Sequence, residues 1–186
     1  MITSWVFKDI KDQNLLLEKH SSFNCNGNGV SSVTNAAKWG SAPFITNASP
    51  FPIFYVNLKI PIYASKYKLA INKDYRFMKN WVFEGSMNRA SYQQLHTGAN
   101  LCDTTVKNAA CDTDCGSNTT KVFSFSPGQY KYFRLRMTSL DSCSSDRMII
   151  HGFDLFGTFI YSKKQCTCLK KQKYIPYCFI IVILTK

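Results

Sequence analysis

Short runs in which hydrophobic and polar residues alternate recur along most of the chain, and they predict β-strands. In residues 66–71 the alternation is regular, and an aromatic, β-branched run follows at 80–85. Period-two alternation, a polar break and a second β-prone run are typical of two strands joined by a loop. The loop, residues 72–79, is polar, basic and aromatic at once, which suits a binding surface on a rigid scaffold.

Similar runs on both sides of this segment predict further strands. They cover residues 54–58, 122–125, 132–137 and 148–159, the last run being bent at Gly152 and Gly157. Pro127-Gly128 predicts a turn between the runs at 122–125 and 132–137. Because short strands follow one another and no convincing amphipathic helix interrupts them, the pattern predicts an all-β sandwich or barrel.

Three stretches depart from this pattern. Residues 20–50 and 98–118 are polar and rich in turn formers, so both are expected to be loops, the first anchored by Trp39 and Phe44. Residues 161–186 are basic and then apolar, and the apolar run is far shorter than the roughly 20 residues that span a bilayer. We interpret them as a tail outside the fold, with a buried edge strand or a membrane-contacting tail as alternatives. The predicted organisation is a lead-in (1–19), one domain (20–160) and this tail.

The composition fits a folded domain whose body is mildly basic. Of 186 residues, 45% are hydrophobic and 15% aromatic, which is typical of a chain with a real core. The formal net charge is +12, but the tail holds six lysines and no acid, which leaves 17 basic and 11 acidic residues in 1–160. This surplus is compatible with anionic glycans, phospholipid headgroups or nucleic acid. Nucleic acid is disfavoured because the charge is modest and scattered.

The eight cysteines lie mostly in the expected loops, and their even number favours disulfides in an oxidising compartment. The disulfide candidates are Cys102, Cys111, Cys115 and Cys143, with Cys143 as a partner for one of the other three. A metal site built from the first three and the neighbouring aspartates is the alternative. It is disfavoured because no second close pair of ligands and no His follows Cys111-x3-Cys115.

The features that bear on the compartment disagree. The glycosylation motif Asn118-Thr119-Thr120, and the weaker Asn47-Ala48-Ser49 with a proline after it, fit an extracellular or cell-surface protein. The first residues, MITSWVFKDIKDQ, lack the basic and apolar segments of a secretory signal. We therefore expect either an N-terminally incomplete piece of a secreted protein or a cytoplasmic protein with reduced thiols.

Four stretches occur in an order that resembles a known family. They are AAKWGSAPF followed by FYVNL (36–58), YKLAI and NWVFEGS (67–86), YKYFRLRM (130–137) and GFDLFGTF (152–159). Their order and spacing resemble the discoidin domain, the type C domain of coagulation factors V and VIII. The resemblance covers roughly residues 20–160. It implies a jelly-roll β-sandwich of the galactose-binding-domain type.

Domains of that family are non-enzymatic and bind glycans or anionic phospholipid headgroups through loops at one end of the barrel. The resemblance therefore implies a non-catalytic module for carbohydrate or a cell-surface glycoconjugate. An anionic phospholipid surface, or a protein partner within a larger intracellular protein, is the alternative. No nucleophile motif surrounds any cysteine, which also argues against an enzyme. No cofactor is expected, because the acidic residue with which sugar-binding relatives often hold calcium is replaced near His151 and Gly152.

By position, the ligand loops of the resemblance fall at 22–35 and 72–79. The candidates in the second loop are Lys73, Tyr75, Arg76 and Lys79. An aromatic ring there stacks on the apolar face of a sugar while the basic groups donate to hydroxyls, or the ring enters a lipid headgroup region while the cations meet phosphate. The alternative interpretation places Phe77 in the core and leaves the charges solvated.

The remaining polar candidates have simpler explanations. Asn24, Asn26 and Asn28 offer a polar rim for the first loop, but turn formation by Asn and Gly is the simpler reason for them. Outward arginines at 134 and 136 are expected to pair with a nearby acid such as Glu84. His96 is expected to be a surface or packing residue.

Overall fold

The computed structural model describes residues 4–6, 43–46, 50–73, 75–108 and 111–159, and this part of the chain is made of strands, turns and loops. The strands are β1 (Ser4–Trp5), β2 (Phe44–Ile45), β3 (Ile53–Ile71), β4 (Asn80–Ser86), β5 (Gln93–Ala99), β6 (Thr105–Asn108), β7 (Cys111–Cys115), β8 (Thr119–Met137), β9 (Ile149–Ile150) and β10 (Gly152–Phe159). The all-β prediction is confirmed. The described residues contain no helix long and apolar enough to cross a membrane.

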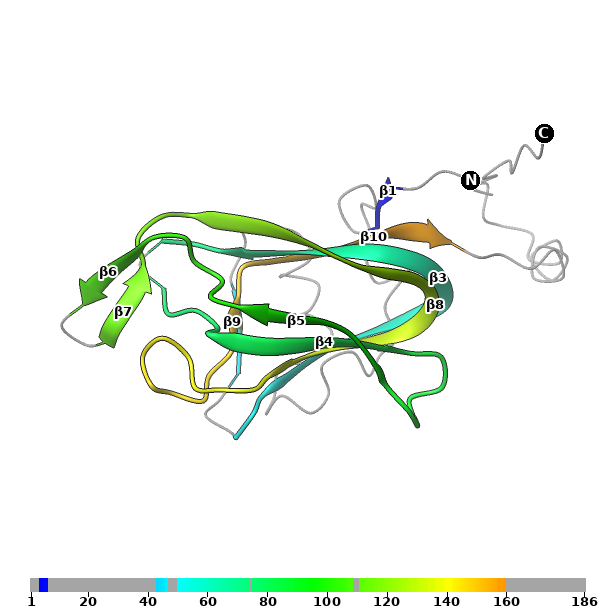
Figure 1. Cartoon of the computed structure of the whole chain (residues 1–186), viewed down its shortest axis with the longest axis horizontal. Coiled ribbons are helices and arrows are strands. Elements are labelled where there is room, and N and C mark those ends of the chain that lie inside the picture. The colour runs from blue at the N-terminus through cyan, green and yellow to red at the C-terminus, as the bar shows by residue number, and fades with distance from the viewer. Residues whose placement is uncertain (1–3, 7–42, 47–49, 74, 109–110, 160–186) are drawn as a thin grey trace, which may run out of the picture.

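The two layers of the sandwich share their longest strands, β3 and β8. These pair antiparallel along most of their length, and the register shifts between Asn57 and Ile62 and between Ala64 and Lys66. On one side of the shifts β4 and β5 extend the pair, and on the other side β10 and β1 extend it. The long strands therefore bend there and pass from one layer into the other (Figure 1).

The prediction of a turn at Pro127-Gly128 is wrong, because both residues lie within a strand. The expected strands 122–125 and 132–137 are parts of the single strand β8, and Gly128 lies opposite Ala64 in the ladder with β3. Glycine fits this bend because a side chain at position 128 would collide with the ring of Tyr130. The same residue types that favour a turn here permit a bent strand to continue.

The segment 98–118, expected to be a loop too polar for the core, also differs from the prediction. It holds the end of β5 and the hairpin of β6 with β7. Its Leu101, Cys102 and Cys115 are buried in the main hydrophobic cluster. These three side chains anchor the otherwise polar segment to the core. Two of them belong to cysteines, which pack like small hydrophobic residues.

Aromatic side chains are the largest fully buried residues of the core between the layers. Tyr67 of β3 stacks on Phe83 of β4 with ring centroids 4.1 Å apart. Its hydroxyl accepts a hydrogen bond from Trp81 Nε1 (2.9 Å) and lies 2.8 Å from His96 Nδ1. His96 is thus a packing residue, as expected. Phe44 is buried as a predicted anchor, whereas Trp39 lies outside the described residues.

The outward ion pair expected on the sheet is confirmed. Arg134 donates from Nε and Nη2 to the two carboxylate oxygens of Glu84, at 2.6 and 3.1 Å. Arg136 Nε lies 3.9 Å from the same carboxylate, and the Arg134 guanidinium stacks on Tyr92. The boundaries proposed at 19/20 and 160/161 fall outside the described residues, although Ser4–Trp5 of the lead-in pairs with β10.

We expect the free energy of unfolding to fall as the pH is lowered through 6.5, the ordinary pKa of His. Burial lowers the pKa of both His96 and His151, so the unfolded chain binds protons that the folded chain does not. A neutral Nδ1 of His96 also accepts a hydrogen bond from the Tyr67 hydroxyl, and protonation of Nδ1 would remove it. Urea denaturation between about pH 7.5 and 5.5 tests this, and His96→Phe should give a shallower dependence on pH. An unchanged slope in the variant would contradict this account.

Candidate ligand-binding site at the loop end

Several loops gather at the end of the sandwich opposite the bend of β3 and β8 (Figure 1). We call this region the loop end, and it comprises residues 72–79, 100–104, 116–118 and 138–148. The hairpin of β6 and β7 projects beside it. The prediction that residues 72–79 form a loop between two strands is confirmed, since β3 ends at Ile71 and β4 begins at Asn80.

The loop 72–79 is held in place by backbone hydrogen bonds from three neighbouring segments. Its carbonyl groups accept N–H bonds from residues 100 and 101, from residue 115 and from residue 142, at 2.7–3.2 Å. In return, the N–H of Phe77 donates to Ser142 Oγ at 3.0 Å. Phe77 is 5% exposed, so it is a core residue, as the alternative interpretation of this loop has it.

Tyr75 is the exposed aromatic residue of the loop. It is 38% exposed, and its ring packs edge-on against His151 with centroids 4.5 Å apart. His151 is buried, and within the described part of the chain its Nδ1 has no hydrogen-bond partner. Burial lowers the pKa of His151 and so favours the neutral form of the ring on which Tyr75 packs.

Arg76 points to a buried carboxylate of the loop 138–148. Its Nη1 lies 3.7 Å from Oδ2 of Asp141, whose side chain is fully buried. Asp141 Oδ1 accepts the backbone N–H groups of Cys143 and Ser145, both at 2.8 Å. Burial raises the pKa of Asp141, while these two hydrogen bonds and the charges of Arg76 and Lys79 oppose the rise. The ion pair with Asp141 positions the guanidinium of Arg76, whose side chain is still 28% exposed.

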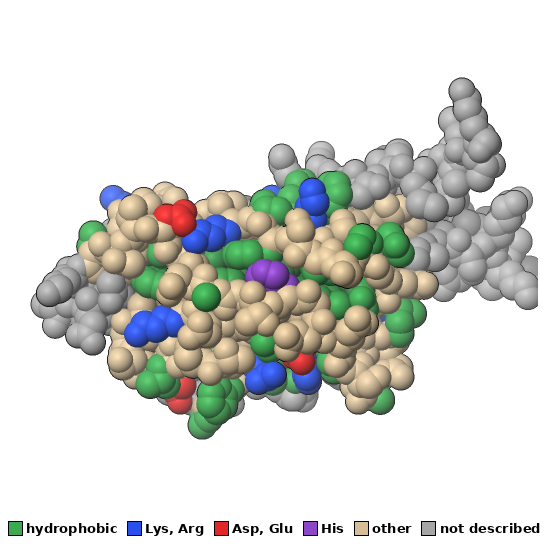
Figure 2. Space-filling view, in the orientation of Figure 1, with side chains coloured by type: hydrophobic (Ala, Val, Ile, Leu, Met, Phe, Trp, Pro, Cys, Tyr) green, Lys and Arg blue, Asp and Glu red, His purple; other side chains and the backbone are tan. Residues whose placement is uncertain are grey.

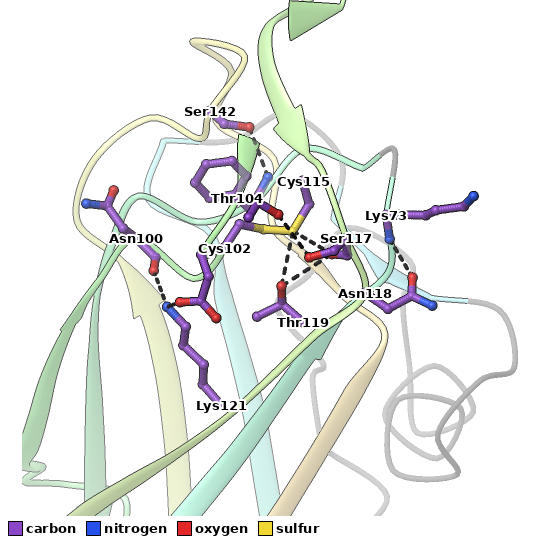
Figure 3. The surroundings of a disulfide bond; sticks show 12 residues. Lys73, Asn100, Cys102, Thr104, Cys115, Ser117, Asn118, Thr119, Lys121 and Ser142 are labelled. Carbon is purple, nitrogen blue, oxygen red and sulfur yellow. Dashed lines mark hydrogen bonds and ion pairs between the residues drawn. A yellow bond between two sulfur atoms is a disulfide. The ribbon is translucent and has the colours of Figure 1, made fainter. Parts of the chain in front are cut away.

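Lys73 is placed differently from the other candidates. Its backbone N–H donates to Oδ1 of Asn118 at 2.7 Å, while its exposed side chain points away from the neighbouring disulfide (Figure 3). The structure thus brings Arg76 and Lys79 to Asp141 of the loop 138–148, packs the Tyr75 ring on His151, and leaves Lys73 at the margin. The candidates Asn24, Asn26 and Asn28 lie outside the described residues.

Sequence reasoning missed Asp141 and His151, the two residues that support the site. Asp141 opens the stretch DSCSS, and an Asp followed by small polar residues is typical of a turn in which the carboxylate accepts nearby backbone N–H groups. That signal indicates an ordered loop at 141–145. It does not reveal the contact with Arg76, which lies 65 positions earlier in the chain.

The disulfide prediction is confirmed for one pair, since Cys102 is bonded to Cys115 (Figure 3). Cys143 is also disulfide-bonded, and its sulfur lies 3.7 Å from Asp114 Oδ1. Cys102 and Cys115 are therefore not metal ligands. In the part of the chain that the structure describes, His, Cys, Asp and Glu side chains form no group of three or more suited to a metal ion.

Replacing both Cys102 and Cys115 by alanine is expected to lower the free energy of unfolding by about 3 kcal/mol, because the bond closes a short loop and restricts the unfolded chain. The two residues are 13 positions apart. Urea denaturation measures the effect, with Val106→Thr on the neighbouring hairpin as a control that should change stability by less than about 0.5 kcal/mol. Equal stability of the double variant and the parent chain would contradict the structural role of this disulfide.

Comparisons with known proteins identify the fold. No protein-family model matches the chain, and no curated protein sequence matches it. Its structure is similar to CBM32-3, a carbohydrate-binding module from a family 31 glycoside hydrolase of Clostridium perfringens. The TM-score is 0.54 and the identity 10%, over 67% of this chain and 81% of the module. The C-terminal domain of a chitobiase from Bacteroides fragilis gives a TM-score of 0.53 at 11% identity, over 85% and 100% of the two chains.

A third solved structure is the Clostridium perfringens module CpGH89CBM32-5 in complex with GalNAc-β-1,3-galactose. It gives a TM-score of 0.50 at 10% identity and covers 66% of this chain and 81% of that module. These neighbours share the galactose-binding-like jelly-roll architecture. The chain described here therefore has the galactose-binding-like jelly-roll fold, as the family resemblance of its sequence implied.

Proposed function

We propose that this chain is a non-catalytic module of the discoidin type that binds carbohydrate at its loop end, through residues 72–79 and 138–148. The observation that carries the proposal is an exposed Tyr75 ring that packs on His151, with the partly exposed guanidinium of Arg76 following it in the loop. Neighbours of the same fold support it, because one is a module of a glycoside hydrolase and another was solved with a disaccharide.

The chemistry of these two residues suits a sugar. A tyrosine ring stacks on the apolar C–H face of a pyranose, and a guanidinium offers several N–H donors in one plane to neighbouring hydroxyls. Because His151 and Asp141 hold Tyr75 and Arg76 in the free protein, little side-chain freedom is lost on binding. Lys73 at the margin and Lys79 near Asp141 add donors and favour a glycan that carries negative charge.

The carboxylate nearest to this pair argues for binding rather than hydrolysis. Glycoside hydrolysis requires two carboxyl groups that reach the scissile bond from opposite sides. Asp141 is fully buried, and one of its oxygens already accepts two backbone hydrogen bonds. It positions Arg76 and the loop, and it does not reach a substrate.

An anionic phospholipid surface is the second candidate, favoured by the basic residues of the loop. Membrane insertion needs exposed apolar side chains beside the cations. Phe77, one of the two aromatic residues of this loop, is buried, so Tyr75 and Leu140 are left as exposed apolar side chains in the loops 72–79 and 138–148. On the face shown in Figure 2, Lys and Arg side chains are scattered among uncharged ones rather than gathered into one patch. These observations favour carbohydrate.

The full chain with its disulfides intact should be screened on a glycan array, with and without calcium, beside a pelleting assay with anionic vesicles. We expect saturable binding to at least one glycan that persists when calcium is removed. Vesicle binding that falls with salt, with no glycan bound by folded protein, would overturn the proposal in favour of the lipid. Failure of both assays would overturn it in favour of a protein partner.

A further inference from the structure

Asn118 occupies an exposed turn between β7 and β8, within the loop end. It begins the sequence Asn118-Thr119-Thr120, which fits the Asn-x-Ser/Thr motif of N-linked glycosylation. Such a motif occurs by chance in many chains, and a buried or inward-facing asparagine cannot carry a glycan in the folded protein. The surroundings of Asn118 therefore decide what the motif means here.

The amide of Asn118 is held in an orientation that suits glycosylation. Its Oδ1 accepts the backbone N–H of Lys73 at 2.7 Å. Because oxygen and nitrogen stand on opposite sides of a planar amide, this bond directs Nδ2 outward, and Figure 3 shows Nδ2 pointing away from the disulfide. A glycan on Nδ2 leaves Oδ1 a carbonyl oxygen, so the bond to Lys73 remains after modification.

The disulfide beside Asn118 is an independent observation that points to the same compartment. Cys115, three positions before Asn118, is bonded to Cys102. Disulfides form and persist in oxidising compartments, among them the lumen of the endoplasmic reticulum, through which secreted glycoproteins pass. A chain that acquires this disulfide there also presents Asn118 to the glycosylation machinery.

We infer that Asn118 is an acceptor of an N-linked glycan that borders the ligand-binding loop. The donor is an oligosaccharide attached to a lipid pyrophosphate. Nδ2 of Asn118 forms the new bond to C1 of the first sugar, and the bond from C1 to the pyrophosphate oxygen breaks. The lipid pyrophosphate leaves with the electron pair, and the amide proton passes to a base of the transferase.

If the proposed function holds, a glycan at Asn118 also affects which ligands reach Tyr75. Asn118 contacts Lys73 directly, and Tyr75 lies two residues further along the same loop. The carbonyl of Tyr75 also accepts the N–H of Cys115, which ties the exposed ring to the segment that carries the glycan. A branched oligosaccharide rooted there restricts the approach of long polysaccharides to Tyr75 and admits short oligosaccharides.

Matched variants at the third position of the motif test the acceptor. Thr120 is exposed, so Thr120→Ser keeps the motif and Thr120→Ala removes it with little effect on the fold. The full chain, secreted from a eukaryotic host behind an added signal peptide, should carry a glycan mass in the parent and in Thr120→Ser, and peptide mapping should place that mass on Asn118. Thr120→Ala should lack it. An unmodified Asn118 in folded, secreted parent protein would overturn the inference.

The same two variants test the effect on access. We expect the unmodified Thr120→Ala chain to bind a polysaccharide severalfold more tightly than glycosylated Thr120→Ser, with equal affinity for a short oligosaccharide of the same sugar. Equal affinity for the polysaccharide would overturn the restriction of access. If neither variant binds any glycan while peptide mapping finds modified Asn118, the proposed function fails and the acceptor site stands.

Discussion

Replacing Phe83 by alanine is expected to lower the free energy of unfolding by about 3–5 kcal/mol. Phe83 is buried between the two layers of the sandwich. It stacks on Tyr67 across the core at 4.1 Å and lies parallel to the ring of Phe133 in the neighbouring strand, with centroids 5.6 Å apart. Because both layers are formed by continuous strands, they cannot collapse into the cavity that alanine leaves.

Urea denaturation of Phe83→Ala at constant pH, with the disulfides intact, measures this cost. Leu140→Ala is a suitable control, because Leu140 is 51% exposed and its truncation should change stability by less than about 0.5 kcal/mol. Phe83→Leu should fall between the two. A loss below about 1 kcal/mol for Phe83→Ala would show that the aromatic contact between the layers does not hold the fold.

The double variant Tyr75→Ala, Arg76→Ala is expected to bind its glycan at least about tenfold more weakly. Loss of a stacked ring costs about 1 kcal/mol and loss of a charged hydrogen-bond donor about 1.5–3 kcal/mol, and 1.4 kcal/mol corresponds to a factor of ten in Kd. Isothermal titration with the best glycan of the array measures the change.

Two further variants make this result specific. Tyr63→Ala removes a tyrosine that is 50% exposed in the bend of β3, far from the loop end, and should leave the affinity unchanged. Arg76→Lys keeps the charge beside Asp141 and should recover part of the affinity, which separates ligand binding from loss of the ion pair. Unchanged affinity in the double variant would move the site elsewhere.

Local alternation in the sequence predicts where most strands lie, but it does not show which short runs join into one long strand. In the runs at 54–58 and 132–137, every second side chain points into the core, so hydrophobic and polar residues alternate with a period of two in the sequence. The bend at Pro127-Gly128 resembles a turn because its residue types are the same. Only the pairing of Gly128 with Ala64, which is 64 positions away, shows that the strand continues.

The position of the candidate site was predictable from the sequence, but the residues that support it were not. A polar, basic and aromatic loop pointed to residues 72–79, and the structure anchors this loop on three sides. Alternation could not separate exposed Tyr75 from buried Phe77, because both stand in a loop whose backbone follows no regular period. Asp141 and His151 support the site from distant positions, so no local pattern links them to it.

Hydrogen–deuterium exchange of the full chain, with and without a saturating glycan, tests most directly whether the loop end binds carbohydrate. Backbone N–H groups of peptides covering 72–79 and 138–148 should exchange more slowly in the complex, because the ligand contacts these loops and restricts their opening. Peptides of β10 and of the bend between the layers should be unchanged. Saturable binding with protection confined to the sheet, and none in these two loops, would contradict the account.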